Sequence, residues 1–374
     1  MENYEIHLPS YSIGSAIYGQ IGGITRTYGR RAVIVGGHKS LAAAGKLIGA
    51  AAEDAGITIT GVRWYGGEAS YENAHTLLND EAVQAADMIF AVGGGKALDT
   101  GKAAGELSGK PVFTFPTIAS TCAATTAVAI LYYPDGRFRQ PYFLHTPPKH
   151  AFINTAVITA APSRYLWAGM GDTYAKYFES SMSSRGEELV HYHRLGVAVS
   201  SMCLEPLLRF GASALADNKA GRLSFPLEQT ILAVVVSTGI ASILLTADHI
   251  IDYNTGLAHA VCYALTSYPQ VESNHLHGEV VAFGVLLLLL VDKNEEMFRK
   301  IYAFNRSVGL PTSIADIEIT PSELEQVIPR VSAMPDIAHN PYPVTEPMVR
   351  EAFAALERYN RGHPKSEPTE EGFL

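Results

Sequence analysis

The sequence contains few cysteines, and their spacing does not suggest a disulfide framework. Only Cys122, Cys203 and Cys262 occur, and no two of them form a CxxC pair. Sparse, unpaired cysteines are typical of proteins in reducing compartments. The N-terminus also lacks a basic region followed by an apolar stretch, so no secretory signal is predicted. We therefore expect a cytoplasmic protein without disulfides.

Positive charge and long apolar runs are also scarce. The formal net charge is -9, which argues against a nucleic-acid partner because such binding depends on Lys and Arg neutralising phosphates. The apolar run 231–246 is interrupted by polar residues, and the run 280–291 is too short to span a bilayer. Both are predicted to be buried helices, and no membrane partner is expected. Charged residues make up only 17% of the chain, which favours a homo-oligomer with buried subunit contacts.

The length of 374 residues allows two domains, each with its own core. The first part of the chain alternates β-branched runs with amphipathic, Ala- and Gly-rich stretches, which predicts βαβ units and a parallel sheet. Strands are predicted at 32–35, 57–64, 88–92 and 111–115, helices at 40–55, 73–85 and 98–107, and a hairpin over 127–143. Helical patterns dominate after residue 160, beginning with 163–181. The prediction is an α/β domain over 1–160 and a helical domain over 161–374.

A glycine run lies between the predicted strand 88–92 and the helix that follows it. Gly93, Gly94 and Gly95 would let backbone N–H groups approach a pyrophosphate, with Lys96 as a counter-charge. The alternative is a tight turn that needs a positive φ and binds nothing. The run matches neither the GxGxxG fingerprint nor a Walker loop.

Hydroxyl side chains follow the next predicted strand, at the sheet edge where open parallel sheets bind ligands. Thr117, Ser120 and Thr121 could meet cofactor phosphate or the nicotinamide amide. The alternative is that they cap the following helix.

One carboxylate and two imidazoles stand in distinctive local sequences within three predicted helical segments: Asp172, His259 and His277. Together they can bind one divalent ion and leave a coordination position open, which is typical of a catalytic metal. Lys176 lies one helical turn after Asp172 on the same face. It is predicted either to recognise a substrate carboxylate or to form a salt bridge with Asp172 or Glu179.

Two further histidines, His249 and His275, are secondary candidates for a proton relay or an extra ligand. Lone histidines of this kind are more often surface or hydrogen-bonded core residues.

Four motifs, at residues 93–102, 116–121, 168–172 and 277–279, together resemble the iron-containing (group III) alcohol dehydrogenase superfamily and its glycerol dehydrogenase-like branch. The resemblance covers residues 5–360. It implies a Rossmann-like N-terminal domain and an all-α C-terminal domain (the dehydroquinate synthase-like architecture), an NAD(P) cofactor and a divalent metal. It places Asp172, His259 and His277 at the metal-ligand positions. It also implies these cofactor-binding residues: Gly37, Gly94, Gly95, Lys96, Asp99, Thr117, Ser120, Thr126, Val128 and Tyr132.

The chain departs from the glycerol dehydrogenase pattern in its substrate pocket. Cys122 stands where those enzymes typically carry an Asp that contacts the polyol, and the sequence 121–124 is more similar to a branch active on 2-hydroxy or 2-oxo acids. Cys262 replaces a polar residue of the usual HAIHNG segment. Lys176 occupies a position where some four-ligand relatives carry a third His, which favours zinc over iron.

A further departure concerns the cofactor. NAD-preferring relatives often carry an acid after the first strand, whereas here Gly37 is followed by His38, Lys39 and Ser40. These three residues could hold a 2′-phosphate, which gives NADP(H) a slight preference. The alternative is that His38 and Lys39 point into solvent.

The leading hypothesis is a metal-dependent oxidoreductase that transfers a hydride between NAD(P)(H) and a polyol, an alcohol or a 2-hydroxy or 2-oxo acid. A dehydroquinate synthase-like lyase or cyclase with transient NAD use is the alternative, although such enzymes usually carry Glu at the position of Asp172. A third hypothesis, a cofactor-binding protein without catalysis, would follow from the changes at Cys122 and Cys262.

Overall fold

The computed structural model describes residues 4–364 and divides into two compact units. Unit 1 consists of Met1–Tyr177 and Glu188–Ile250, and unit 2 consists of Phe178–Glu187 and Ile251–Leu374. Helix α8 (Arg164–Ser183) contributes residues to both units. The division by compactness therefore differs from the predicted division at residue 160. In the described part of the chain the last strand ends at Asn154, close to that residue, and the domain boundary itself stays a prediction.

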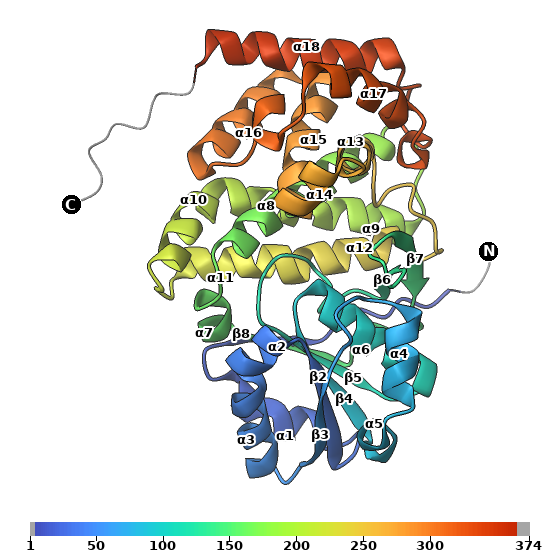
Figure 1. The fold of residues 1–374 in the computed structure, drawn as a ribbon, viewed down its shortest axis with the longest axis vertical. Helices are drawn as coiled ribbons and strands as arrows, with labels where there is room; N and C mark the ends of the chain where they lie inside the picture. Colours follow the sequence, from blue (N-terminus) through green and yellow to red (C-terminus); the bar gives the residue numbers. More distant parts are fainter. Residues whose placement is uncertain (1–3, 365–374) are drawn as a thin grey trace. The chain divides into compact units, whose positions relative to one another are not determined.

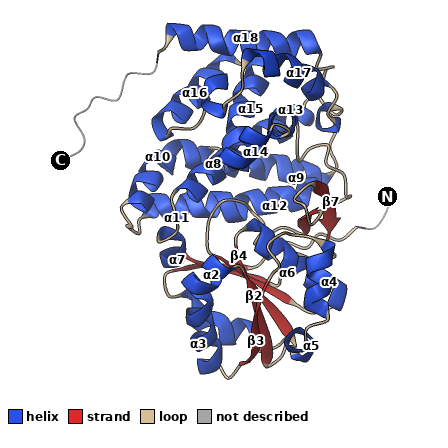
Figure 2. Cartoon of the chain, in the orientation of Figure 1, coloured by secondary structure: helices blue, strands red, loops and turns tan. Residues whose placement is uncertain are grey.

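Unit 1 contains a six-stranded, fully parallel sheet, as the alternating pattern predicts (Figures 1 and 2). Its strands, in spatial order, are β1 (Tyr11–Gly14), β8 (His150–Asn154), β5 (Val112–Pro116), β4 (Met88–Gly93), β2 (Arg31–Gly36) and β3 (Thr58–Trp64). A separate antiparallel hairpin, also predicted, is formed by β6 (Val128–Tyr132) and β7 (Phe138–Phe143).

Helices cover both faces of the sheet because the strands are apolar on both sides. Successive side chains of a strand point to opposite faces. Val33 and Val35 of β2 belong to a cluster with Leu77, Val83 and Leu98, which come from α4, α5 and α6. The intervening residue, Ile34, belongs to a second cluster that includes residues of α1, η2 and α3. Continuous burial of β2, β4 and β5 is what a parallel sheet between two helical layers requires.

The helices of unit 1 follow in chain order, with short 3-10 or π-type turns marked η. They are η1 (Ile17–Gln20), α1 (Ile21–Thr25), α2 (His38–Ser40), η2 (Leu41–Gly45), α3 (Lys46–Asp54), α4 (Tyr71–Leu78), α5 (Glu81–Ala85), α6 (Gly95–Ser108), α7 (Thr155–Thr159), most of α8, α9 (His191–Ser200), η3 (Ser201–Cys203), α10 (Glu205–Lys219), α11 (Phe225–Leu232), η4 (Ala233–Ser237) and α12 (Thr238–Leu245).

Two features of unit 1 differ from the sequence prediction. The single helix predicted over 73–85 is two helices, because Asp80 accepts hydrogen bonds from Ala82 N and Val83 N and begins α5. Strands β1 and β8 were not predicted. They pair with each other across a long sequence separation, and β8 is followed at once by α7.

The order of the strands creates a switch point between β2 and β4. From β2 the chain continues to β3 on one side, whereas β4 and β5 lie on the other side. Gly36 is paired with Val92, and Gly93 with Pro116, so the carboxyl ends of β2, β4 and β5 lie at one edge. Ligands of open α/β sheets bind at such an edge. The segments that begin at Gly37, Gly94 and Thr117 are therefore neighbours.

Two helical stretches of unit 1, His191–Lys219 and Phe225–Leu245, are long and apolar enough to pass a test for membrane spans by length and composition. Core helices of soluble proteins pass the same test. In Phe225–Leu245, 72% of the most apolar 18-residue stretch is buried inside the protein, as the prediction of a buried helix over 231–246 requires.

Unit 2 is helical throughout its described part. After the end of α8 it contains α13 (Leu257–Thr266), α14 (Pro269–Asn274), α15 (His277–Val291), α16 (Glu295–Val308), η5 (Ile314–Ile317), α17 (Pro321–Ser332), η6 (Pro335–Ile337) and α18 (Glu346–Gly362). Helices α13 and α15 approach closely at Gly284, where a Cβ atom would lie 2.3 Å from the carbonyl oxygen of Ala258. Glycine at this position lets the two helices that begin near His259 and His277 pack without a gap.

Candidate metal centre and cofactor loop

The structure brings the three predicted metal ligands together. Asp172 on α8, His259 on α13 and His277 on α15 each offer one ligand atom, and these atoms lie within 4.8 Å of one another. Two imidazole nitrogens and one carboxylate oxygen form a donor set that a catalytic zinc ion accepts while keeping one position for water or substrate. The residues present therefore fit a divalent ion.

Glu179 orients His259, a role that was not predicted from the sequence. Its Oε2 atom lies 2.7 Å from Nδ1 of His259, and its Oε1 atom accepts hydrogen bonds from Gly256 N and His259 N, both at 2.9 Å. The side chain of Glu179 is fully buried. A carboxylate on Nδ1 fixes the tautomer, so that Nε2 carries the free lone pair that a metal ligand needs. Seven residues separate Asp172 from Glu179, two turns of one helix, and this spacing is the signal from which Glu179 could have been found.

His277 has a thiol near its Nδ1 atom, where His259 has a carboxylate. Its Nδ1 atom lies 3.6 Å from Sγ of Cys262, the residue at which the sequence departs from the glycerol dehydrogenase pattern. The ring of Tyr263, four residues after His259 on α13, lies 5.8 Å from the His259 ring and 6.3 Å from the His277 ring between centroids. Tyr263 therefore borders both imidazoles, a position that was not predicted from the sequence.

Cys122, the predicted substrate residue, is a partly buried thiol in the electrostatic field of charged residues of α8. Burial, with a smaller contribution from Asp172, raises the pKa of the thiol to about 12, against the opposing effects of Lys176 and Lys102. Cys122 is therefore neutral near pH 7 and is neither a thiolate nucleophile nor a charged substitute for aspartate. Lys176 itself is buried, at 6% exposed.

The glycine run forms the turn between β4 and α6. Gly93 has φ of +152° and Gly94 is the residue before the first turn of α6, with no side chain capping the helix. The first N–H groups of a helix lack partners within the helix and favour anions. Lys96 is not an isolated charge, because its Nζ atom lies 2.7 Å from Oε2 of Glu68 and 5.2 Å from the centre of the Tyr132 ring.

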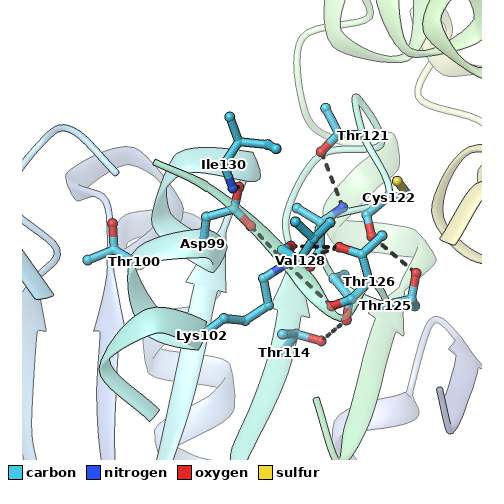
Figure 3. Close-up of polar contacts among 12 residues, drawn as sticks. Asp99, Thr100, Lys102, Thr114, Thr121, Cys122, Thr125, Thr126, Val128 and Ile130 are labelled. Atoms are coloured by element: carbon cyan, nitrogen blue, oxygen red, sulfur yellow. Dashed lines mark hydrogen bonds and ion pairs between the residues drawn. The ribbon is translucent and has the colours of Figure 1, made fainter. Parts of the chain in front are cut away.

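Several residues predicted to bind the cofactor use their polar atoms inside the protein (Figure 3). Asp99 is paired with Lys102, and Thr126 accepts a hydrogen bond from Lys102 and donates one to the carbonyl of Val128. Burial raises the pKa of the Asp99 carboxyl, and Lys102 opposes this effect. Thr117 donates its backbone N–H to Gly93, and Thr121 accepts a hydrogen bond from Ala123 N. Contacts of these residues and of Ser120 with a cofactor stay predictions.

The segment after β2 is divided between internal contacts and exposure. The Ser40 hydroxyl donates to the carbonyl oxygens of Gly37 and Val92 and accepts from Gly37 N, so it caps the turn. His38 and Lys39 are exposed, and the His38 ring stacks on Trp64 with centroids 5.2 Å apart.

The two secondary histidines have their own contacts. The His249 ring stacks on Phe143, with centroids 4.6 Å apart. His275 places its Nδ1 atom 2.8 Å from Oε1 of Glu279, and Oε2 of Glu279 accepts a hydrogen bond from Leu276 N. Neither belongs to the metal-ligand group found among the described residues.

Comparison with known proteins agrees with this geometry. The pattern of the family described as iron-containing alcohol dehydrogenase matches residues 9–155. A glycerol dehydrogenase from Thermotoga maritima is 34% identical over 311 residues, 79% of this chain and 81% of that protein. The chain belongs to the iron-containing alcohol dehydrogenase family. Hydroxycarboxylate dehydrogenase A from Escherichia coli is 29% identical over 277 residues, covering 73% of this chain and 75% of that one.

The fold is confirmed by the same comparison. The crystal structure of a probable glycerol dehydrogenase from Sinorhizobium meliloti matches with a TM-score of 0.80 at 28% identity, over 96% of this chain and 100% of that one. This member of the iron-containing alcohol dehydrogenase family is thus an oxidoreductase of the glycerol dehydrogenase-like branch. These relatives do not favour the dehydroquinate synthase-like alternative.

Proposed function

We propose that this enzyme transfers a hydride between NAD(P)(H) and a small hydroxy or oxo compound, with a divalent metal held by Asp172, His259 and His277. The observation that carries the proposal is the convergence of these three donors within 4.8 Å. Glu179 strengthens it, because a buried carboxylate on Nδ1 prepares His259 as a ligand through Nε2.

The metal would supply a Lewis acid for the substrate oxygen, and the nicotinamide would supply or accept the hydride. The charge of the metal site is set by the residues that hold the ion. Asp172 contributes the one negative charge of the donor set, so the site retains positive charge toward an oxygen. Zinc is the metal we propose, because two imidazoles and one carboxylate with a free position are the donor set of known catalytic zinc sites.

The substrate that we propose is a 2-hydroxy or 2-oxo acid rather than glycerol. The Cys122 thiol stays neutral and offers no carboxylate to accept hydrogen bonds from a polyol. Lys176, a buried lysine one turn after Asp172, is the residue that we propose to recognise the carboxylate of such a substrate. The similarity to a hydroxycarboxylate dehydrogenase supports the same substrate class.

For the cofactor we propose NADP(H) in preference to NAD(H). The segment after β2 presents exposed His38 and Lys39 and no acid, and a 2′-phosphate needs cationic or hydrogen-bonding partners at that position. The Ser40 hydroxyl has internal hydrogen-bond partners, so His38 and Lys39 are the residues that we propose to meet the 2′-phosphate. The expectations of a cytoplasmic homo-oligomer are part of the same proposal.

The test combines ligand substitutions with a substrate panel. Asp172→Ala and His259→Ala should each abolish metal retention and turnover while cofactor binding persists. Activity should be measured with 2-oxo acids and simple aldehydes in the presence of NADH or NADPH, and with glycerol in the presence of NAD+ or NADP+. His75→Ala, an exposed histidine of α4, is the matched control. Unchanged activity in Asp172→Ala would refute the metal assignment, and turnover of glycerol alone would refute the substrate class.

A further inference from the structure

A lysine ammonium is enclosed completely within unit 1, beside the loop that connects β5 to β6 (residues 117–127). Lys102 of α6 has 0% of its side chain exposed. A buried ammonium is costly unless each proton has an acceptor and its charge is balanced. The contacts of Lys102 meet both conditions.

Three close acceptors of the β5–β6 loop and of β6 face the ammonium group of Lys102 (Figure 3). They are the carbonyl oxygens of Ala123 at 2.8 Å and Val128 at 2.6 Å, and the hydroxyl of Thr126 at 3.0 Å. The carboxylate of Asp99, one turn earlier on α6, lies 2.8 Å away and balances the charge. The end of the β5–β6 loop therefore folds around one cation.

Asp99 extends the same connection to strand β6. While its Oδ1 atom pairs with Lys102, its Oδ2 atom accepts a hydrogen bond from Ile130 N at 3.1 Å. Asp99 and Lys102 both lie on α6, and this helix begins at Gly95 in the glycine run. One helix therefore carries the anion-binding turn at its start and, within its first two turns, the pair of charges that holds the neighbouring loop.

We propose that Lys102 is a positioning residue for the cofactor: paired with Asp99, it holds the β5–β6 loop in register with the glycine run so that both can contact one dinucleotide. This inference rests on the proposed function, because it assumes that the two segments bind NAD(P)(H). Fixing a loop before the ligand arrives removes its ordering cost from the binding free energy.

The second lysine of this region shows what an ordinary structural contact would do. Lys110, just after α6, also donates to backbone carbonyl oxygens. Its acceptors are Gln84 in α5 and Ala86 directly after α5. It does not contact the β5–β6 loop in any hydrogen bond or ion pair shown for the described residues. Lys110→Met is therefore a matched control that removes a lysine-to-carbonyl contact without touching the loop.

The experiment compares Lys102→Met with Lys110→Met in the full-length, metal-loaded protein. Binding of NADPH and NADH, followed by nicotinamide fluorescence, should weaken by about tenfold or more in Lys102→Met because the loop must order on binding. Amide hydrogen exchange over residues 119–132 should accelerate in the same variant, and metal content should not change. Lys110→Met should match the wild type in all three measurements.

Asp99→Asn/Lys102→Met separates positioning from folding, because it removes both charges and leaves no unpaired buried ion. This variant should regain stability but not cofactor affinity. If both variants fail to fold, Lys102→Arg, which keeps the charge on a wider head group, should show the same localised acceleration of exchange.

A folded variant without Lys102 that binds cofactor and exchanges its loop amides like the wild type would overturn the inference. If the wild type binds neither NADH nor NADPH, the proposed function fails instead, and hydrogen exchange alone then decides whether Lys102 holds the loop.

Discussion

Replacing Glu179 by Gln should reveal how far metal binding depends on a residue that does not touch the metal. The substitution keeps the size of the side chain and replaces one carboxylate oxygen by an NH2 group. In the wild type, one oxygen accepts from Gly256 N and His259 N, and the other faces Nδ1 of His259 at 2.7 Å. Because two N–H donors occupy one side, the Gln oxygen must remain there and its NH2 group must face the imidazole.

This orientation reverses the direction of the hydrogen bond to His259. The NH2 group can only donate, so Nδ1 must accept and the ring proton must move to Nε2. A protonated Nε2 has no lone pair for a metal. Binding then requires either the less favoured tautomer or the loss of the Gln hydrogen bond. Changes of this kind typically weaken metal affinity by about 10- to 100-fold, which corresponds to roughly 1.4 to 2.7 kcal/mol.

The measurement is a competition titration of zinc against a chelator, combined with thermal unfolding of the metal-free protein. Unfolding should change little, by about 1 kcal/mol, because the two backbone N–H groups keep their acceptor. Glu279→Gln is the matched control, since Glu279 holds His275 Nδ1 in the same manner at 2.8 Å and Gln can still accept from Leu276 N. Wild-type zinc affinity in Glu179→Gln, or an equal loss in Glu279→Gln, would refute the reasoning.

Two further predictions concern stability. Gly169→Ala should destabilise the protein by about 1 to 3 kcal/mol in urea unfolding, because the added Cβ would lie 2.5 Å from the Ala119 carbonyl oxygen. Gly49→Ala is the control and should not destabilise the protein, because its Cβ would meet nothing within 4 Å. Equal stability of the two variants would contradict the prediction. Burial lowers the pKa of His150 from 6.5 to about 4. Between these two pH values His150 is therefore protonated in the unfolded chain and neutral in the folded protein. Stability should therefore fall by up to about 3 kcal/mol as the pH drops from 6.5 to 4. A His150→Gln variant should lose this part of the pH dependence, and an identical pH profile would show that another group is responsible.

The sheet and the metal ligands were predictable because their signals are local. The run 32–35 is apolar at every position, which predicts a strand covered on both faces, and β2 is buried at all positions after Arg31. Each of the three metal ligands lies in a short segment that can be judged without its neighbours in space. Their meeting within 4.8 Å then follows from the packing of three helices.

The supporting residues were not predictable in the same way, because their partners are distant in the sequence. The spacing of Glu179 from Asp172 places it on the helix that carries a ligand, but nothing in its own segment shows that it acts on a histidine 80 residues later. Strand β1 has the same difficulty: it has only four residues, half of its pattern is polar or glycine, and its partner β8 lies about 140 residues away. Such short edge strands form because the neighbouring strand has backbone N–H and C=O groups available for pairing. The sequence of the short segment alone does not show that these groups are nearby.

The glycine-loop motif shows why a residue's membership in a binding motif does not establish that it contacts the ligand. The segment 93–102 resembles the family pattern throughout, yet its residues divide between two tasks. Gly94 and Gly95 leave the first N–H groups of α6 available to an anion, whereas Asp99 and Lys102 direct their charges into the β5–β6 loop. A substitution at Gly95, whose added Cβ would lie at an ordinary contact distance of 3.4 Å from Oγ1 of Thr121, should therefore act through direct contact with the ligand, and one at Asp99 or Lys102 through the order of a neighbouring segment. The first should change cofactor affinity without changing hydrogen exchange of the free protein; the second should change both.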